Sequence, residues 1–161
     1  MSQSFAALLL AARRQRQLVI ATALTDGEPS GQARQARLAQ QQGAGAAELR
    51  ADLLADPAQV RAALAAVRAA SSLPLLLTYR SATEGGKGAG HGQGYEDYLA
   101  SLLQLRPPVA ALDIEMACPA SKALVAEAKA GGYDVVGSCH DFTATPSAAQ
   151  ITQKLVQITA A

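Results

Sequence analysis

The sequence lacks the features that mark several classes of protein. It has no Trp, only 4% aromatic residues and a net charge of +1, so no basic surface predicts binding to nucleic acid or to an anionic membrane. No apolar run approaches the roughly 20 residues of a transmembrane helix. What remains is a chain of 161 residues, half of them hydrophobic, mainly Ala and Leu. This length and composition predict one globular domain with a core of its own.

Cysteine is also scarce. Cys118 and Cys139 are the only two, and they lie far apart without the paired spacing of zinc ligands. We therefore expect no metal site from the cysteines and interpret both as reduced thiols, which are typical of a cytoplasmic protein.

The amino-terminal segment, residues 1–17, differs from the rest of the chain. Its apolar patch precedes a group of arginines, whereas a secretory signal places the positive charge first. We expect a short helix that caps the domain. An organelle transit peptide is the alternative, because the segment is rich in Arg and free of acidic residues.

Residues 18–161 alternate between two kinds of sequence pattern. Short apolar runs predict five strands: Leu18–Leu24, Ala46–Leu54, Leu73–Ala82, Val109–Met116 and Tyr133–Phe142. Apolar residues spaced three and four positions apart predict a helix after each strand: Gly31–Gln42, Pro57–Ala70, Gly94–Leu105, Pro119–Ala130 and Pro146–Ile158.

Five consecutive strand–helix units predict an α/β fold with a parallel sheet and right-handed crossovers. The strands are nearly continuous apolar runs, as expected when both faces of the sheet are covered. Two architectures fit this pattern, a doubly wound sheet and a (βα) barrel. No G-x-G-x-x-G motif follows the first strand, so the dinucleotide-binding form of the doubly wound sheet has no support.

The segment EGGKGAGHGQG (Glu84–Gly94) is rich in glycine but does not match a phosphate-binding loop. We expect a flexible surface loop here, with His91 exposed to solvent.

Charged residues interrupt strands that otherwise consist of Leu, Val and Ala. Burying them is costly unless they are paired or take part in chemistry. In parallel α/β folds the functional groups gather at the carboxyl ends of the strands. Four consecutive strands deliver such residues there: Glu48, Arg50 and Asp52; then Arg80, Ser81 and Glu84; then Asp113 and Glu115; and finally His140 and Asp141.

Any one of these groups has a structural explanation, such as a Glu48–Arg50 ion pair or a hydrogen-bonded core His140. Their convergence on one rim favours a pocket for a small anionic substrate. Arginines bind carboxylates with two parallel hydrogen bonds. A histidine transfers protons, and Glu84 or another acid would fix its tautomer and charge.

Four segments resemble type I 3-dehydroquinate dehydratase, the Schiff-base enzyme of the shikimate pathway. They are ELRADLLAD, PLLLTYRSATEGG, LDIEM and VVGSCHDFTATPSAAQITQKL, in the order and at about the spacing of that family. The resemblance extends from Leu18 to the last residue. It implies a (βα)8 barrel that is often dimeric, of which about five of eight units are present. It also implies a cytoplasmic enzyme with no metal and no dissociable cofactor.

The resemblance assigns a role to each of these residues. His140 is the general acid–base that takes a proton from the carbon beside the ketone of 3-dehydroquinate and helps the hydroxyl leave as water. Glu84 orients it. Glu48 and Arg50 line the pocket, and Arg80 holds the carboxylate or hydroxyls of the substrate. The supporting charged network consists of Asp113, Glu115, Asp52 and Asp141.

The family also uses a lysine on the sixth strand, which forms an imine with the substrate ketone, and no such strand precedes Ala161. Of the four lysines, Lys87 lies on the correct rim, and the others fall on predicted outer helices: Lys122, Lys129 and Lys154. Three hypotheses follow: a dehydratase, a silent remnant or ligand-binding pseudoenzyme, and an unrelated doubly wound binding domain. Five of eight units also leave two strand edges exposed, to be covered by a second copy or a complementing chain unless the sheet flattens.

Overall fold

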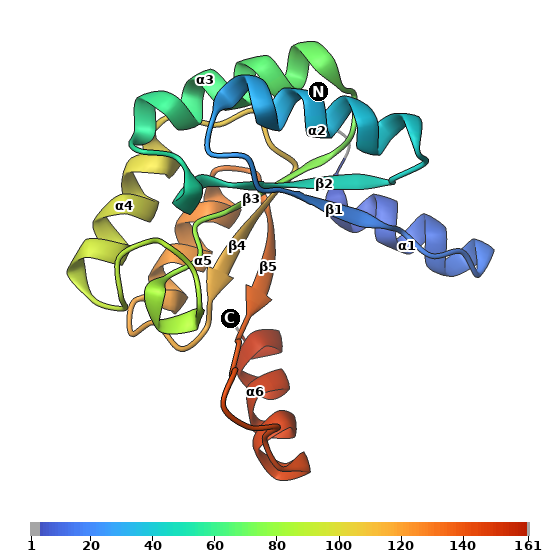
Figure 1. The fold of residues 1–161 in the computed structure, drawn as a ribbon. Coiled ribbons are helices and arrows are strands. Elements are labelled where there is room, and N and C mark those ends of the chain that lie inside the picture. The colour runs from blue at the N-terminus through green and yellow to red at the C-terminus, as the bar shows by residue number, and fades with distance from the viewer. Residues whose placement is uncertain (1–3, 161) are drawn as a thin grey trace.

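The computed structural model describes residues 4–160 and shows one parallel sheet with helices packed around it (Figure 1). The strands are β1 (Ala21–Leu24), β2 (Ala46–Arg50), β3 (Leu75–Thr78), β4 (Ala111–Glu115) and β5 (Asp134–Ser138). The helices are α1 (Phe5–Gln15), α2 (Pro29–Gln41), α3 (Pro57–Ala70), α4 (Gln93–Gln104), α5 (Ser121–Ala130) and α6 (Ala148–Ala160). Two short 3-10 helices follow strands, η1 (Ala51–Leu53) and η2 (Ala82–Glu84). The predicted α/β class is confirmed.

The strand order decides between the two predicted architectures. Every strand pairs in parallel with its neighbours in the chain, in the order β1-β2-β3-β4-β5. A doubly wound sheet reverses the direction of strand addition at a switch point, and this sheet does not. The sequential order is that of a (βα) barrel, so the doubly wound alternative is wrong for this chain.

The observed strands are shorter than the predicted ones. β2 ends at Arg50, and the chain then turns through η1, where Asp52 accepts hydrogen bonds from the backbone N–H groups of Arg80 and Lys87. β5 likewise ends at Ser138. The polar residues at the carboxyl ends therefore lie mostly in the turns after the strands, where their backbone can bend toward one another.

Successive side chains along each strand point to opposite faces of the sheet, and the apolar ones form two separate clusters. Leu75 and Leu77 of β3 belong to the larger cluster, which includes residues of α2, α3, α4 and α5. Leu76 points to the opposite face and packs in a smaller cluster with Ala46 and Ala111. Phe5 of α1 also belongs to this smaller cluster. The inner face of the sheet is therefore apolar near its amino end and polar near its carboxyl end.

The edges of the sheet carry exposed apolar side chains. Figure 1 shows α6 extending away from the body of the molecule beyond β5, and no residue of α6 is buried. The large exposed side chains beside β1 and on the segment after β5 are Leu18, Ile20, Phe142, Ile151, Leu155 and Val156. Within residues 4–160, no helix is long and apolar enough to cross a membrane.

Candidate active site

Arg80, two residues after β3, is the centre of a buried ion network. Its Nη1 lies 2.9 Å from Glu115 Oε1 and 2.9 Å from Ser138 Oγ, and its Nη2 lies 3.0 Å from Asp113 Oδ1. Glu84 Oε2 is 3.5 Å from Nη1. Arg80 is 8% exposed, and the three carboxylates are at most 3% exposed. Both terminal nitrogens of the guanidinium are therefore held by the protein's own acceptors.

The two acids of β4 differ in their affinity for a proton. Burial raises the pKa of Asp113 to about 6, although Arg80 and the hydroxyl of Ser138 favour the ionised form. Burial also acts to raise the pKa of Glu115. Hydrogen bonds from Ser81, through its N–H at 2.8 Å and its hydroxyl at 2.5 Å, reverse this effect and hold that pKa below its ordinary value. One acid of the network thus titrates near neutral pH, and the other stays ionised.

Glu84 and His140 come together from segments far apart in the sequence. Glu84 Oε2 accepts a hydrogen bond from the backbone N–H of His140 at 2.9 Å and lies 2.8 Å from its Nδ1. A carboxylate at Nδ1 favours the tautomer with the proton on Nδ1, which leaves Nε2 free to accept one. The imidazole side chain is 38% exposed and lines a cavity of about 430 Å³. This pair has the geometry of an oriented general base.

Arg50 of β2 does not form the ion pair with Glu48 that the sequence analysis considered. Arg50 forms a bidentate ion pair with Asp52, Nε to Oδ1 and Nη2 to Oδ2, both at 2.8 Å, rather than with Glu48. Its hydrogen bond to Asp52 raises the pKa of Arg50, and burial opposes this. Burial opposes ionisation of Asp52 too, but its hydrogen bonds from Arg50 and Lys87 lower its pKa. Glu48 is half-buried on the same face of β2 as Arg50.

Asp141 does not join this network, contrary to the prediction. It is exposed, and its carboxylate accepts hydrogen bonds from the N–H and hydroxyl of Thr143 and from the N–H of Ala144. These bonds lower the pKa of Asp141 and hold the turn after β5. Asp141 lines the same cavity as His140, but its carboxylate does not reach the Arg80 network, because the chain has already left the sheet.

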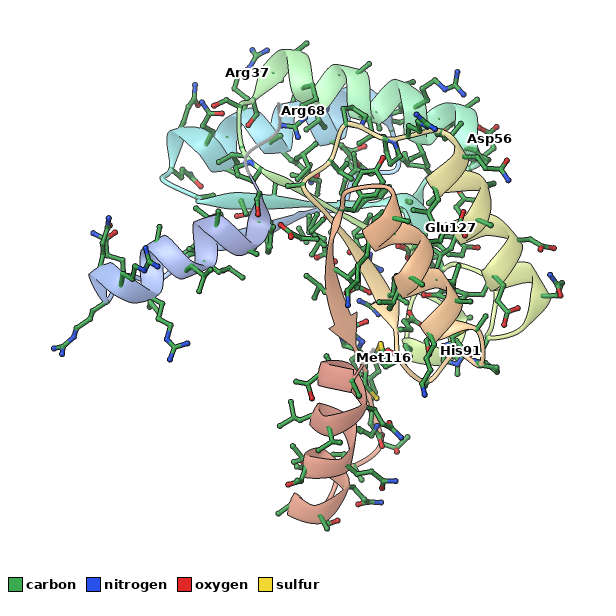
Figure 2. The ribbon with its side chains drawn as sticks, turned by 180° about the vertical axis from the view of Figure 1, so that it is seen from behind. Arg37, Asp56, Arg68, His91, Met116 and Glu127 are labelled. Carbon is green, nitrogen blue, oxygen red and sulfur yellow. The ribbon has the colours of Figure 1, made fainter. Side chains whose placement is uncertain are left out.

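His91 is not the solvent-exposed residue that was predicted. Its side chain is 15% exposed, its Nε2 lies 2.6 Å from Glu115 Oε2, and its ring meets Tyr95 edge-on at 5.6 Å between centroids. Figure 2 shows His91 at the end of the sheet where Met116 follows β4. The cavity beside His140 is lined by both histidines.

The glycine-rich loop places His91 there because it folds back onto the end of β3. Gly86 and Gly88 donate backbone hydrogen bonds to the carbonyls of Ser81 and Arg80, at 2.7 and 3.0 Å. A Cβ at Gly86 would lie 2.1 Å from the carbonyl oxygen of Arg80, so only glycine permits this approach. The predicted flexible loop (Glu84–Gly94) therefore folds back in a defined conformation, and we call it the glycine-rich strap. The spacing of its glycines was the sequence signal that could have indicated this close approach.

The lysines lie on the elements that the sequence predicted, and one of them also reaches the cavity beside His140. Lys87 is exposed on the loop, and Lys122 and Lys129 are exposed on α5. Lys154 on α6 lines the same cavity as His140, and its Nζ lies 2.6 Å from Cys139 Sγ. This contact raises the pKa of Lys154. Lys154 therefore lies on an outer helix, as predicted, and its side chain also reaches the cavity beside His140, which the sequence did not predict.

Two further polar residues of the site were missed. Ser138 on β5 donates to Asp113 at 2.8 Å and contacts Arg80, and the hydroxyl of Tyr95 accepts from the backbone N–H of Glu115 at 3.3 Å. In the sheet register Ser138 lies beside Glu115. A small polar residue next to a strand acid was the available signal for Ser138.

Sequential parallel strands with acid–base and ionic groups at their carboxyl ends define a chain built on the plan of a (βα)-barrel enzyme. The model of the family "Type I 3-dehydroquinase" matches residues 20–161, and the chain belongs to this family. The resemblance seen in the sequence is thereby confirmed.

Individual relatives agree with this assignment. The 3-dehydroquinate dehydratase of Methanosarcina acetivorans is 34% identical over 124 residues, which cover 74% of this chain and 51% of that protein. The protein of the same name from Methanoregula boonei is 38% identical over 128 residues, covering 79% and 54%. The solved structure of 3-dehydroquinate dehydratase from Enterococcus faecalis aligns with a TM-score of 0.79 at 28% identity, covering 88% and 61%. The chain spans about half the length of the curated relatives that it matches.

Proposed function

We propose that this chain carries the substrate-binding and proton-transfer part of a 3-dehydroquinate dehydratase site. The reaction converts 3-dehydroquinate to 3-dehydroshikimate and water. The observation that carries the proposal is the Glu84–His140 pair beside the Arg80 network, at the carboxyl ends of the strands of a type I family member. Glu48 and Arg50, on the same face of β2, would line the substrate pocket.

The proposed proton path uses a single imidazole. Glu84 holds the proton of His140 on Nδ1, so Nε2 takes the proton from the carbon beside the substrate ketone. The imidazolium then returns this proton to the departing hydroxyl. One C–H bond and one C–O bond break, a carbon–carbon double bond forms, and water leaves. Arg80, whose Nη1 lies 3.5 Å from Glu84 Oε2, holds that carboxylate in place while the charge on the imidazole changes.

The electrons released from the C–H bond need an acceptor, and an imine between a lysine and the ketone is the acceptor that the family uses. Among the lysines of this chain, Lys154 lines the cavity that holds His140. We propose Lys154 as the amine available within the chain, which forms the imine once it has lost the proton that its contact with Cys139 favours. The alternative donor is a complementing chain that also covers the exposed edges of β1 and β5.

Trapping with borohydride tests the proposal. Wild type and the variants Lys154→Ala, Lys87→Ala and Lys122→Ala are incubated with 3-dehydroquinate and borohydride, and adducts are located by mass spectrometry. Ultraviolet absorbance of the conjugated product reports turnover. We expect turnover and an adduct that disappear in Lys154→Ala but persist in Lys122→Ala, whose exposed side chain lies on α5. His140→Gln should abolish turnover.

Each other outcome of the trapping experiment supports a different hypothesis. An adduct that moves to Lys87 would replace Lys154 in the proposal. Binding of 3-dehydroquinate without an adduct or turnover would make this chain a ligand-binding remnant that needs a complementing chain. Absence of binding would overturn the proposal as a whole. A cytoplasmic location and a second copy as the partner belong to the same proposal, and the unpaired thiols of Cys118 and Cys139 support the former.

A further inference from the structure

Three ligand-type atoms meet beside His140 without involving its ring. They are Glu84 Oε1, His91 Nε2 and Glu115 Oε2, and all lie within 4.8 Å of one another. His91 Nε2 is 2.6 Å from Glu115 Oε2 and 4.0 Å from Glu84 Oε1. The three side chains come from η2, the glycine-rich strap and β4, so the fold rather than the local sequence assembles them.

One of these atoms has no hydrogen-bond partner among the described residues. Glu84 is 3% exposed, and its Oε1 is buried without a hydrogen bond, whereas its Oε2 is engaged by His140. A buried carboxylate oxygen without a donor is costly, and a bound cation at this position would stabilise it. Oε1 lies on the side of the carboxylate that is nearer to His91.

The charges around this group are unbalanced. Arg80 supplies one positive charge to the buried carboxylates of Glu84, Asp113 and Glu115. Its guanidinium contacts Glu115 Oε1 and Glu84 Oε2. Of the opposite oxygens, Glu115 Oε2 accepts a hydrogen bond from the hydroxyl of Ser81 at 2.5 Å and lies 2.6 Å from His91 Nε2, and Glu84 Oε1 has no hydrogen bond. The excess of negative charge, at nearly buried oxygens next to an imidazole, favours a dication.

We propose that Glu84 Oε1, His91 Nε2 and Glu115 Oε2 bind a divalent transition-metal cation of the zinc type. One imidazole and two carboxylates are ligands that Zn²⁺ accepts, and three protein ligands leave a fourth position open toward the cavity. Bonds of about 2.1 Å place two ligands of a tetrahedral ion about 3.4 Å apart. The distances of 2.6 and 4.0 Å lie on either side of this value, so binding of the ion requires the ring of His91 to move away from Glu115 and toward Glu84.

This site goes beyond the dehydratase chemistry, which uses no metal, and it would make the cavity a receptor for oxygen ligands that can complete the coordination. A protonated His91 paired with Glu115 alone is the competing explanation. That explanation leaves Glu84 Oε1 without a hydrogen bond, with the His91 ring 4.0 Å away, and it predicts no metal binding.

Isothermal titration of the full chain with Zn²⁺, with any affinity tag removed, tests the proposal. We expect one Zn²⁺ per chain in wild type and an affinity at least about tenfold lower in His91→Ala and in Glu84→Gln. Cys139→Ser and Asp141→Asn serve as matched controls, because they remove a thiol and an acid near the cavity without removing a proposed ligand, and their affinity should remain within about twofold of wild type. Co²⁺ in place of Zn²⁺ adds a visible absorption spectrum that His91→Ala should lose.

Two results would overturn the proposal: no stoichiometric binding by wild type, or binding that His91→Ala leaves unchanged. Circular dichroism shows whether Glu84→Gln still folds, and His91→Ala, on a loop, keeps the test valid if it does not. The titration contains no 3-dehydroquinate, so its outcome is independent of the dehydratase proposal.

Discussion

Replacement of Arg80 measures most directly how much the buried ion network contributes to the free energy of unfolding. Arg80→Met would leave Asp113, Glu115 and Glu84 buried without their shared cation. Breaking a buried ion pair in this way costs about 3–5 kcal/mol. We expect the free energy of unfolding, measured with urea, to fall by that amount. Arg61→Met, at an exposed position of α3, is the matched control and should change it by less than about 0.5 kcal/mol.

Asp113 predicts a dependence of stability on pH. Its pKa is about 6 in the folded chain and 3.8 ordinarily, so folding favours the protonated acid. The resulting stabilisation is fully present below pH 3.8 and is lost as the pH rises through about 6. Asn at this position mimics the protonated acid. The free energy of unfolding of wild type, relative to Asp113→Asn, should therefore decrease by up to about 3 kcal/mol between pH 4 and 7. Parallel curves for the two proteins would contradict this assignment.

The individual charged residues were visible in the sequence, but their partners were not. Acids at alternate positions of one strand, such as Asp113 and Glu115, share a face by geometry alone, so their proximity could be predicted. The pairing of Arg50 with Asp52 depends on the turn through η1, and the position of His91 depends on the fold of a loop. Neither is determined by strand periodicity.

At the level of elements, the glycine-rich strap is the segment that we expect to tolerate substitution least. Gly86→Ala would bring a methyl group against the backbone of Arg80, and we expect a loss of about 1–3 kcal/mol from the forced shift. Gly90→Ala is the control in the same strap, because its Cβ would meet nothing nearer than Thr83 Oγ1 at 3.4 Å. Thermal unfolding of the two variants side by side measures the difference. Equal losses would mean that the strap does not need the close approach.

We propose that the amino-terminal segment caps the amino end of the sheet through α1, although residues 1–3 of the predicted cap (1–17) lie outside the described residues. Ser4 accepts from the N–H of Ala7 at the start of the helix and donates to Asp134 at 2.8 Å, while Phe5 packs against Ala46. Ser4→Ala should reduce the free energy of unfolding by about 1 kcal/mol, measured by urea denaturation. An unchanged value would indicate that α1 contributes little to the fold.

The positions of the five strands and of the helices between them followed from apolar periodicity, whereas the strand ends did not. Hydrophobic residues continue past the last paired residue of β2, because the turn there is buried too. Past β5 the apolar run extends to Phe142, which is exposed. Periodicity reports burial, and burial extends further than backbone pairing.

For the whole molecule, the two unpaired edges of the sheet, on β1 and β5, determine whether copies of the chain associate in solution. Apolar side chains remain exposed beside β1 and on α6, among them Ile20 and Leu155. We expect self-association that grows with concentration, measured by sedimentation velocity. Leu155→Glu should reduce it, and Gln157→Glu, an exposed position on the same helix, should add the same charge without that effect. A wild-type chain that stays monomeric would contradict this expectation.

The sequence predicted the number of units but could not choose between a barrel and a doubly wound sheet. Both are made of the same strand–helix units, and they differ only in which strands lie side by side. That choice depends on long-range packing of helices against the sheet, which no local pattern contains.

The strictly sequential order of the strands has a consequence for synthesis on the ribosome. Each new strand finds its partner in the segment translated just before it, so the sheet can grow by one unit at a time without waiting for distant parts of the chain. At every stage the most recent strand offers a free edge to the next. The exposed edge of β5 is the same kind of surface that β4 presented one unit earlier, a template that accepts whichever strand reaches it first.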